Sequence, residues 1–194
     1  MENNDIELML RFKEGDNSAF EALLDKYEKP ALNFIYRMVG NTGDAEDLTQ
    51  ELFFRIYHSA KKYNPTAKFS TWLFKIAYNL TIDFIRKNKN KIFGTESVLY
   101  EGNDGDDKRE EIEKHDELPI DQKIENKKIG KKINSYLYKL PYKQKTALIL
   151  KIFEDKSYKE ISDIIGCSIP AVESLLFRAR ETLKTQLSTL LHGK

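Results

Sequence analysis

The residues with the clearest chemical purpose lie near the C-terminus, in residues 157–184. A short helical pattern of isoleucines ends at Gly166, and Ser168 and Pro170 follow it closely. Glycine readily takes the left-handed conformation of a tight turn, serine caps a helix, and proline fits the first helical turn. This order of residues predicts a helix-turn-helix, the motif that inserts a helix into the major groove of duplex DNA.

The second helix of this motif has two different sides when it is read at about 100° per residue. The apolar side, which we expect to face the core, comprises Ile169, Val172, Leu176, Ala179 and Leu183. The opposite side carries Ala171, Ser174, Arg178 and Thr182, flanked by Arg180 and Lys184. Small side chains allow close approach to a groove, while arginine and serine contact base edges or phosphates. The alternative is an ordinary helical hairpin with a solvated outer side.

An acidic surface that contains an aromatic residue is predicted on an earlier helix. Its core-facing stripe comprises Ala45, Leu48, Leu52 and Ile56. The other face carries Asp47, Gln50, Glu51 and His58, with Phe54 among them. An aromatic side chain in a polar face is unfavourable in water unless something covers it. Two interpretations stay open: a solvated face whose Phe54 lies under a neighbouring loop, and an acidic protein-docking surface with an aromatic anchor.

A catalytic interpretation of the same helix is weaker. Asp47 and Glu51 lie one helical turn apart, as do the carboxylates that bind magnesium in all-helical nucleotide pyrophosphohydrolases. Such a site needs more carboxylates from a second helix, and the other predicted helices offer no matching acidic pair on a core-lining face. We therefore expect no metal, no cofactor and no catalytic residue.

Residues 61–87 interleave aromatic and basic side chains across a loop and the start of a helix. Aromatic rings can stack on unpaired bases while lysines hold the phosphates, so this segment is a candidate for binding single-stranded nucleic acid. Several of its apolar residues could instead be core, namely Phe69, Trp72, Leu73, Ile76 and Leu80. The loop lysines and Asn79 are harder to place in a core. Both interpretations stay open from the residues alone.

Helices must position these segments, and turn residues mark where the helices end. Within residues 5–90 a turn is expected at Gly15, and Pro30 is expected to begin a helix. Asp44 is expected to cap the next helix, which should run to about residue 60. A further helix is predicted from about residue 70 to residue 89.

The rest of the chain has a different pattern. Residues 91–120 are rich in acids, contain glycines and show little periodicity, which predicts a flexible acidic linker. Residues 121–190 are again helical in pattern, with breaks at Pro141, at 156–157 and at Gly166. Strand-type alternation does not persist anywhere. We therefore predict an all-α fold of two small helical domains joined by a flexible acidic linker, with a C-terminal helix-turn-helix.

Composition limits the class of protein. The formal net charge of +1 hides an acidic middle and a C-terminal part in which bases outnumber acids from Pro119 onward. The single cysteine excludes an internal disulfide, and the histidines lack metal-ligand spacing. No stretch is long and apolar enough to span a membrane, and the first residues lack a signal core. We expect a cytoplasmic protein without membrane insertion.

Four motifs together resemble a known family. They are DAEDLTQE at 44–51, FSTWLFKIAYN at 69–79, SYKEI at 157–161 and FRARE at 177–181. The first two resemble the second conserved region of extracytoplasmic-function (ECF) RNA polymerase sigma factors, and the last two resemble the fourth region. The motifs come in the expected order and spacing. The chain has no room for the third-region domain of larger sigma factors, which agrees with this small class.

The resemblance implies how the chain is divided. Residues 1–90 would be region 2, which binds core RNA polymerase and the minus-ten promoter element. Residues 91–120 would be an acidic linker that threads through polymerase channels. Residues 121–194 would be region 4, whose helix-turn-helix binds the minus-thirty-five element.

The resemblance also implies three sets of site residues. The side chains that would dock on the clamp helices of the largest polymerase subunit are Asp44, Glu46, Asp47, Gln50, Glu51 and Phe54. Those that would bind the minus-ten element and capture a flipped base are Lys62, Tyr63, Lys68, Phe69, Trp72, Lys75 and Asn79. Those that would bind the minus-thirty-five element are Tyr158, Lys159, Ser168, Ala171, Ser174, Phe177, Arg178 and Arg180.

The implied function is that of a bacterial sigma factor under the control of an anti-sigma factor, with no catalysis of its own. Two residues depart from the family pattern, because Glu173 and Leu175 stand where many members carry basic residues. Base readout should therefore rest on Ser174 and Arg178. The alternative is a stand-alone helix-turn-helix regulator, which would bind duplex DNA without polymerase.

Overall fold

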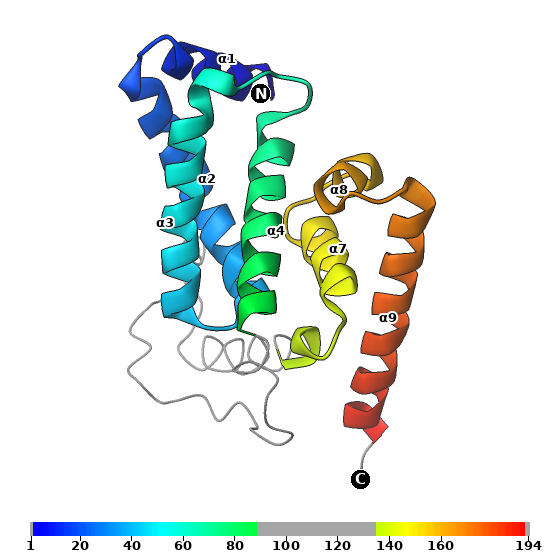
Figure 1. The fold of residues 1–194 in the computed structure, drawn as a ribbon. Helices are drawn as coiled ribbons and strands as arrows, with labels where there is room; N and C mark the ends of the chain where they lie inside the picture. The colour runs from blue at the N-terminus through cyan, green and yellow to red at the C-terminus, as the bar shows by residue number, and fades with distance from the viewer. Residues whose placement is uncertain (1, 89–134, 193–194) are drawn as a thin grey trace, which may run out of the picture.

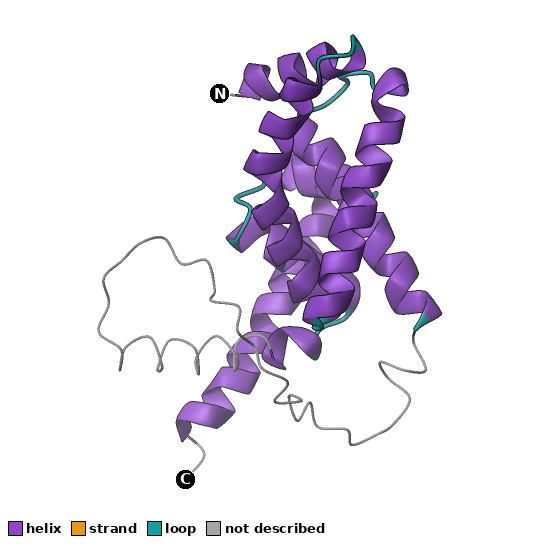
Figure 2. Cartoon of the chain, turned by 90° about the vertical axis from the view of Figure 1, so that its left-hand side faces the viewer, coloured by secondary structure: helices purple, strands orange, loops and turns teal. Residues whose placement is uncertain are grey.

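The computed structural model describes residues 2–88 and 135–192, and this part of the chain contains helices and loops but no strand (Figures 1 and 2). The elements are α1 (Glu2–Lys13), α2 (Asn17–Val39), α3 (Thr42–Ser59), the short 3₁₀ helix η1 (Ala60–Lys62), α4 (Phe69–Lys87), α7 (Tyr142–Ile152), α8 (Tyr158–Ile165) and α9 (Ile169–His192). The all-α prediction is confirmed. The predicted linker, 91–120, lies outside the described residues.

The first four helices enclose a core of aromatic and aliphatic side chains. Phe34 of α2 and Phe74 of α4 are fully buried and meet edge to face, with ring centroids 5.3 Å apart. Leu23, Leu52 and Ile56 are also fully buried. Burial of each such side chain contributes about 1.5–3 kcal/mol. This core fixes α3 and α4, which carry the predicted site residues of the N-terminal half.

Helix α2 corrects one expectation from the sequence. Pro30 lies in the interior of this continuous helix and does not begin a new one. Proline lacks a backbone N–H, so it removes a helical hydrogen bond and costs about 3 kcal/mol in a helix interior. The helix continues because buried residues on both sides of Pro30, from Ala19 to Val39, form one apolar stripe. Packing of such a stripe outweighs local propensity.

The start of α3 corrects a second expectation. The cap is Asn41, whose Oδ1 accepts a hydrogen bond from the backbone N–H of Asp44 at 2.9 Å. The helix therefore begins at Thr42, and Asp44 lies in its first turn, where a negative charge is favourable. The other ends of α3 and α4 lie within two residues of the predicted ones.

The predicted helix-turn-helix is confirmed as α8, a turn and α9. A capping box begins α8, because the Ser157 hydroxyl accepts from the Glu160 backbone N–H and the Glu160 carboxylate accepts from the Ser157 N–H. Gly166 ends α8 with a φ of 72°, in the left-handed region. The Ser168 hydroxyl accepts from the Ala171 N–H at the start of α9. Gly166 and Ser168, the residues from which the turn was predicted, therefore form it in the structure.

Ser157→Ala is expected to lower the free energy of unfolding of the C-terminal half by about 1 kcal/mol, because it deletes the cap of α8. Urea denaturation followed by circular dichroism measures the loss. Ser174→Ala, at an exposed position of α9, is the control and should change the free energy by less than about 0.5 kcal/mol. Equal losses in the two variants would contradict a specific capping role.

The two halves of the chain pack directly on one another. Helix α8 lies against α4, and α7 lies against α2 (Figure 1). At the C-terminal end of α2, Lys145 Nζ donates to the Met38 carbonyl at 2.9 Å, and the Tyr138 hydroxyl donates to the Tyr36 carbonyl at 3.3 Å. The last carbonyls of a helix lack intrahelical partners, so the C-terminal half supplies the Met38 carbonyl with a hydrogen bond, whereas the Tyr36 carbonyl also accepts from the Gly40 backbone N–H at 2.8 Å.

The contact between the halves is expected to strengthen as the pH rises from 7 to about 9. Burial lowers the pKa of Lys145 from 10.5 to about 7. The contacting state thus binds fewer protons than the separated state between these pKa values, and raising the pH favours it. Burial also raises the pKa of Glu154 to about 7. Titration of this carboxyl therefore affects the contact mainly below pH 7, outside the range from 7 to about 9.

Energy transfer between dyes at Glu21→Cys and Glu181→Cys, two exposed positions in opposite halves, measures this contact in a Cys167→Ser background. Transfer should rise over the stated pH range and stay level in Lys145→Met. An equal rise in the Lys145→Met chain would contradict the assignment to Lys145.

Candidate functional site

Helix α3 presents the predicted acidic face to solvent. Asp47, Gln50 and Phe54 are exposed, whereas Asp44, Glu46 and Glu51 are half-buried. The Phe54 side chain is 59% exposed and packs on one side against His58, with ring centroids 4.1 Å apart. An exposure this large rules out the interpretation in which a loop of the described chain covers Phe54. The other interpretation, a protein-docking surface with Phe54 as its aromatic anchor, therefore remains.

A groove of about 410 Å³ lies beside Phe54, between α2 and α3. Phe20, Leu24, Phe53 and Tyr57 contribute most of its apolar lining. Apolar grooves with aromatic anchors and a charged rim are typical of protein–protein interfaces. This surface therefore has the composition needed to bind another protein.

Two residues of the predicted minus-ten set belong to the core. Tyr63 and Phe69 are buried, and they pack with Tyr27 and Trp72 at ring-centroid distances of 5.0–6.4 Å. Burial, with the nearby Asp5 charge, raises the pKa of the Tyr63 hydroxyl. Both rings fill the space between helices, so the core interpretation that the sequence left open for Phe69 is confirmed and extends to Tyr63, while a minus-ten role for the two residues stays a prediction.

The other members of the minus-ten set are accessible. Lys62, Lys75 and Asn79 are exposed, and Lys68 and Trp72 are half-buried. Trp72 rests on the buried rings of Tyr63 and Phe69, which holds its orientation. A fixed, partly exposed aromatic ring among lysines can stack on an unpaired base while the lysines contact phosphates.

The helix-turn-helix presents most of the predicted minus-thirty-five residues outward. Ser174, Phe177, Arg178 and Arg180 of α9 are exposed, as are Lys159 of α8 and Ser168 of the turn, whereas Tyr158 and Ala171 are half-buried. Val172, Leu176 and Ala179 are buried, as the periodicity predicted. Ile169 was expected in this core stripe but is 43% exposed, because it is the first residue of α9 and directly follows the turn.

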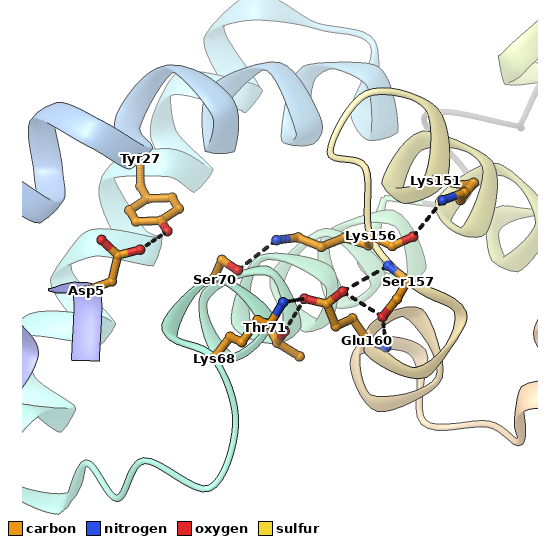
Figure 3. Close-up of polar contacts among 9 residues, drawn as sticks. All are labelled: Asp5, Tyr27, Lys68, Ser70, Thr71, Lys151, Lys156, Ser157 and Glu160. Atoms are coloured by element: carbon orange, nitrogen blue, oxygen red, sulfur yellow. Dashed lines mark hydrogen bonds and ion pairs between the residues drawn. The ribbon is translucent and has the colours of Figure 1, made fainter. Parts of the chain in front are cut away.

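The structure also brings together polar residues that sequence patterns did not connect (Figure 3). Lys156 Nζ donates to Ser70 Oγ at 2.7 Å. Glu160 Oε1 lies 3.4 Å from Lys68 Nζ and 3.4 Å from Thr71 Oγ1. We call Lys68, Ser70, Thr71, Lys156 and Glu160 the α4–α8 seam.

Sequence reasoning missed this seam for a simple reason. The hydrogen-bonded partners Ser70 and Lys156 are 86 positions apart, and Thr71 and Glu160 are 89 positions apart. Helical periodicity relates residues only three or four positions apart. The spacing of Ser157 and Glu160 does signal a capping box, but it carries no information about α4.

Metal chemistry finds no support in the described part of the chain, where no group of three or more His, Cys, Asp or Glu side chains could hold a metal ion. None of the described helices is both long enough and apolar enough to cross a membrane.

Comparison with known proteins identifies both halves. The Sigma-70 region 2 family matches residues 23–91, and the Sigma-70 region 4 family matches residues 131–183. The ECF RNA polymerase sigma factor SigW of Bacillus subtilis (strain 168) is 36% identical over 178 residues. That alignment covers 92% of this chain and 94% of SigW.

Two solved structures have a similar fold. CnrH in complex with the cytosolic domain of CnrY gives a TM-score of 0.68 at 22% identity, covering 96% of this chain and 98% of that chain. The sigma factor RpoE in complex with the anti-sigma factor NepR from Bartonella quintana gives 0.65 at 21% identity, covering 87% and 96%. Both support the helical arrangement described above.

Proposed function

The chain belongs to the extracytoplasmic-function RNA polymerase sigma factors, and from this membership we propose how its parts share the work of transcription initiation. As a sigma factor it binds core RNA polymerase, recognises promoter DNA and initiates transcription. Residues 1–90 act as region 2, residues 91–120 as the acidic linker, and residues 121–194 as region 4. One observation supports this division: the same chain carries an acidic helix that exposes Phe54 and a capped helix-turn-helix that exposes Arg178.

Helix α3 is the core-polymerase-binding element. The exposed Phe54 ring inserts between apolar side chains of the polymerase clamp helices, and Asp47 and Gln50 contact polar groups around it. Asp44, Glu46 and Glu51 add negative charge to the rim. Complementary charge at a rim mainly speeds association, whereas a central aromatic anchor slows dissociation.

The N-terminal half of α4 and its preceding loop bind the minus-ten element. Trp72 is the ring that faces an unpaired base, and Lys62, Lys68 and Lys75 hold phosphates. Asn79 supplies hydrogen bonds to base or sugar. Unstacking a base costs a few kcal/mol, so a place for the extruded base favours opening of the duplex. Tyr63 and Phe69 act from the core by holding Trp72.

Helix α9 binds the minus-thirty-five element in the major groove. Ser174 and Arg178 read base edges from its exposed side, and Arg180 contacts phosphate. Phe177, which is 66% exposed, is available for contact with thymine methyl groups, because apolar side chains read that group. Lys159 and the Ser168 hydroxyl fix the helix on the backbone.

Three further properties follow from the proposal. The protein supplies recognition and no catalysis, and RNA synthesis belongs to the polymerase. It acts in the cytoplasm, where the chromosome and polymerase are. An anti-sigma factor controls it, as NepR binds its structural relative RpoE.

Run-off transcription tests the function directly. The full chain is added to bacterial core RNA polymerase on a library of genomic fragments, and the transcripts are sequenced. Specific transcripts that share upstream elements are expected, with none from core polymerase alone. A chain that neither binds core polymerase nor yields such transcripts would refute the proposal. Tight, specific binding to duplex DNA without polymerase would instead favour the stand-alone regulator.

A further inference from the structure

The loop between η1 and α4 receives a hydrogen bond from a lysine of α1. Lys13 is the last residue of α1, and its Nζ donates to the Tyr63 carbonyl at 3.1 Å, across 50 positions of the sequence. The backbone at Tyr63 is extended, with a φ of −61° and a ψ of 129°, so the 3₁₀ helix ends there. A hydrogen bond from an ammonium group is stronger than one between neutral groups. Lys13 therefore fixes the place where the chain leaves η1 and enters the loop.

The end of α1 that carries Lys13 is itself packed firmly. Phe12, the residue before Lys13, is only 7% exposed. Its ring stacks on the ring of Phe20, with centroids 4.6 Å apart, and lies 5.0 Å from the ring of Tyr57. Aromatic pairs of this kind add to the stabilisation that comes from burial. A side chain can hold another segment in place only from a fixed position, and Phe12 provides that position for Lys13.

The first half of α1 is also fixed to its neighbours. Asp5 is buried, and its carboxylate accepts from the Tyr27 hydroxyl at 2.6 Å and pairs with Lys26 Nζ at 2.5 Å. A buried charge that is paired in this way resists displacement, because separation would leave it without a partner. The Tyr27 ring in turn lies 5.3 Å from the ring of Phe69, which lies 5.8 Å from that of Trp72. Helix α1 and the rings that support Trp72 therefore form one packed unit.

Tyr63 connects Lys13 to Trp72. The Tyr63 ring lies 5.0 Å from the half-buried Trp72 ring, centroid to centroid. The Tyr63 hydroxyl is buried and has no hydrogen-bond partner among the described residues. The polar contacts that orient Tyr63 are therefore made by its backbone, whose carbonyl accepts from Lys13 and whose N–H donates to the Ala60 carbonyl at 3.0 Å. Loss of the Lys13 bond would free the side of Tyr63 that faces the loop.

We propose that Lys13 is a positioning residue for recognition of the minus-ten element. It holds the Tyr63 backbone, and through Tyr63 it keeps the Trp72 ring in the orientation that receives an unpaired base. Lys13 acts without touching DNA, since a ring that is already oriented loses less conformational freedom when the base binds. The inference rests on the proposed function for the identity of the ligand, whereas the coupling of Lys13 to Trp72 is a property of the free chain.

Lys13→Met tests the coupling in the free chain. Trp72 is the only tryptophan of the sequence, so intrinsic fluorescence reports on its ring alone. Methionine removes the hydrogen-bond donor, and local loosening of the loop should raise the acrylamide quenching constant of the full-length chain about twofold. Lys13→Arg keeps a donor and should restore the quenching of the unmodified chain. Lys29→Met removes a lysine from an exposed position of α2 and should also match the unmodified chain.

The same variants test the role in recognition when they are bound to core polymerase. A 2-aminopurine base placed in the minus-ten element of a promoter found by run-off transcription reports opening of the duplex. Lys13→Met should lower the fraction of open promoter about fivefold, the lower end of what one base–aromatic stack contributes. The affinity for core polymerase should stay unchanged. The salt dependence of promoter binding should also stay unchanged, whereas loss of a direct phosphate contact would reduce its slope by about 1.

The outcomes separate the parts of the inference. Unchanged quenching in Lys13→Met, or an equal rise in Lys29→Met, would overturn the coupling to Trp72. Stronger quenching with normal promoter opening would overturn the role in recognition, and a reduced salt slope would assign Lys13 to a phosphate instead. Circular dichroism confirms folding, and Lys13→Ala, which favours the helix, replaces Lys13→Met if that variant does not fold.

Failure of the proposed function is recognised separately. If the unmodified chain gives no specific transcripts with core polymerase, the minus-ten element is not its ligand. The quenching of Trp72 still decides whether Lys13 orients this ring, because that measurement needs neither polymerase nor DNA.

Discussion

Phe54→Ala is expected to weaken binding of the chain to core RNA polymerase by about 2 kcal/mol, or roughly 30-fold. The reason is that Phe54 is the exposed aromatic anchor of α3, 59% open to solvent at the edge of an apolar groove. Its truncation removes buried contact area from the complex while deleting little packing from the free chain. Fluorescence anisotropy of the labelled chain titrated with core polymerase gives the two dissociation constants.

A matched control separates docking from folding. Leu10→Ala truncates another partly exposed apolar side chain, on α1 and away from the groove, and should leave the affinity unchanged. Asp47→Lys, on the same exposed face of α3 as Phe54, should abolish binding at physiological salt without unfolding the chain. Wild-type affinity in both Phe54→Ala and Asp47→Lys would show that α3 is not the docking element.

Arg178→Ala is expected to reduce minus-thirty-five recognition by about tenfold to a hundredfold, because one arginine contact to a base edge contributes roughly 1–3 kcal/mol of discrimination. Arg178 is exposed on the outer side of α9, one turn after Ser174, and the buried stripe behind it does not depend on it. Run-off transcription should show the loss at promoters found with the unmodified chain. Promoters that rely mainly on the minus-ten element should retain more activity.

Arg180→Ala provides the comparison. This exposed arginine flanks the reading face, so its loss should weaken binding to all promoters alike and reduce the dependence on salt. Arg178→Ala should instead relax the preference at particular bases. Identical promoter profiles for the two variants would contradict the division between base reading and phosphate contact.

Much of the local structure could be predicted from the sequence. The turn at Gly166, the cap of α9 at Ser168 and the outward side of α9 all follow from signals that act within one helical turn. The acidic face of α3 follows from helical periodicity in the same way. The family followed from four motifs because their residue types, order and spacing are specific in combination.

Local signals failed where burial depends on distant partners. Pro30 is a helix-starting residue by propensity, yet it lies inside α2 because core packing on both sides holds the helix together. Tyr63 and Phe69 have the composition of a base-stacking segment, yet they fill the core beside Tyr27. Nothing within a few residues of these positions distinguishes a ring that faces solvent from one that faces the core.

The sequence by itself therefore determined the helical class, the helix-turn-helix, the acidic face of α3 and the family, because hydrogen bonds and periodicity within a few residues encode them. Only the tertiary structure decided which aromatic rings remain open, with Trp72 partly exposed and Tyr63 buried. It alone also brought Glu160 to the start of α4 and Lys145 to the end of α2. Those contacts join residues that are far apart in the chain, and their energies depend on how whole helices pack.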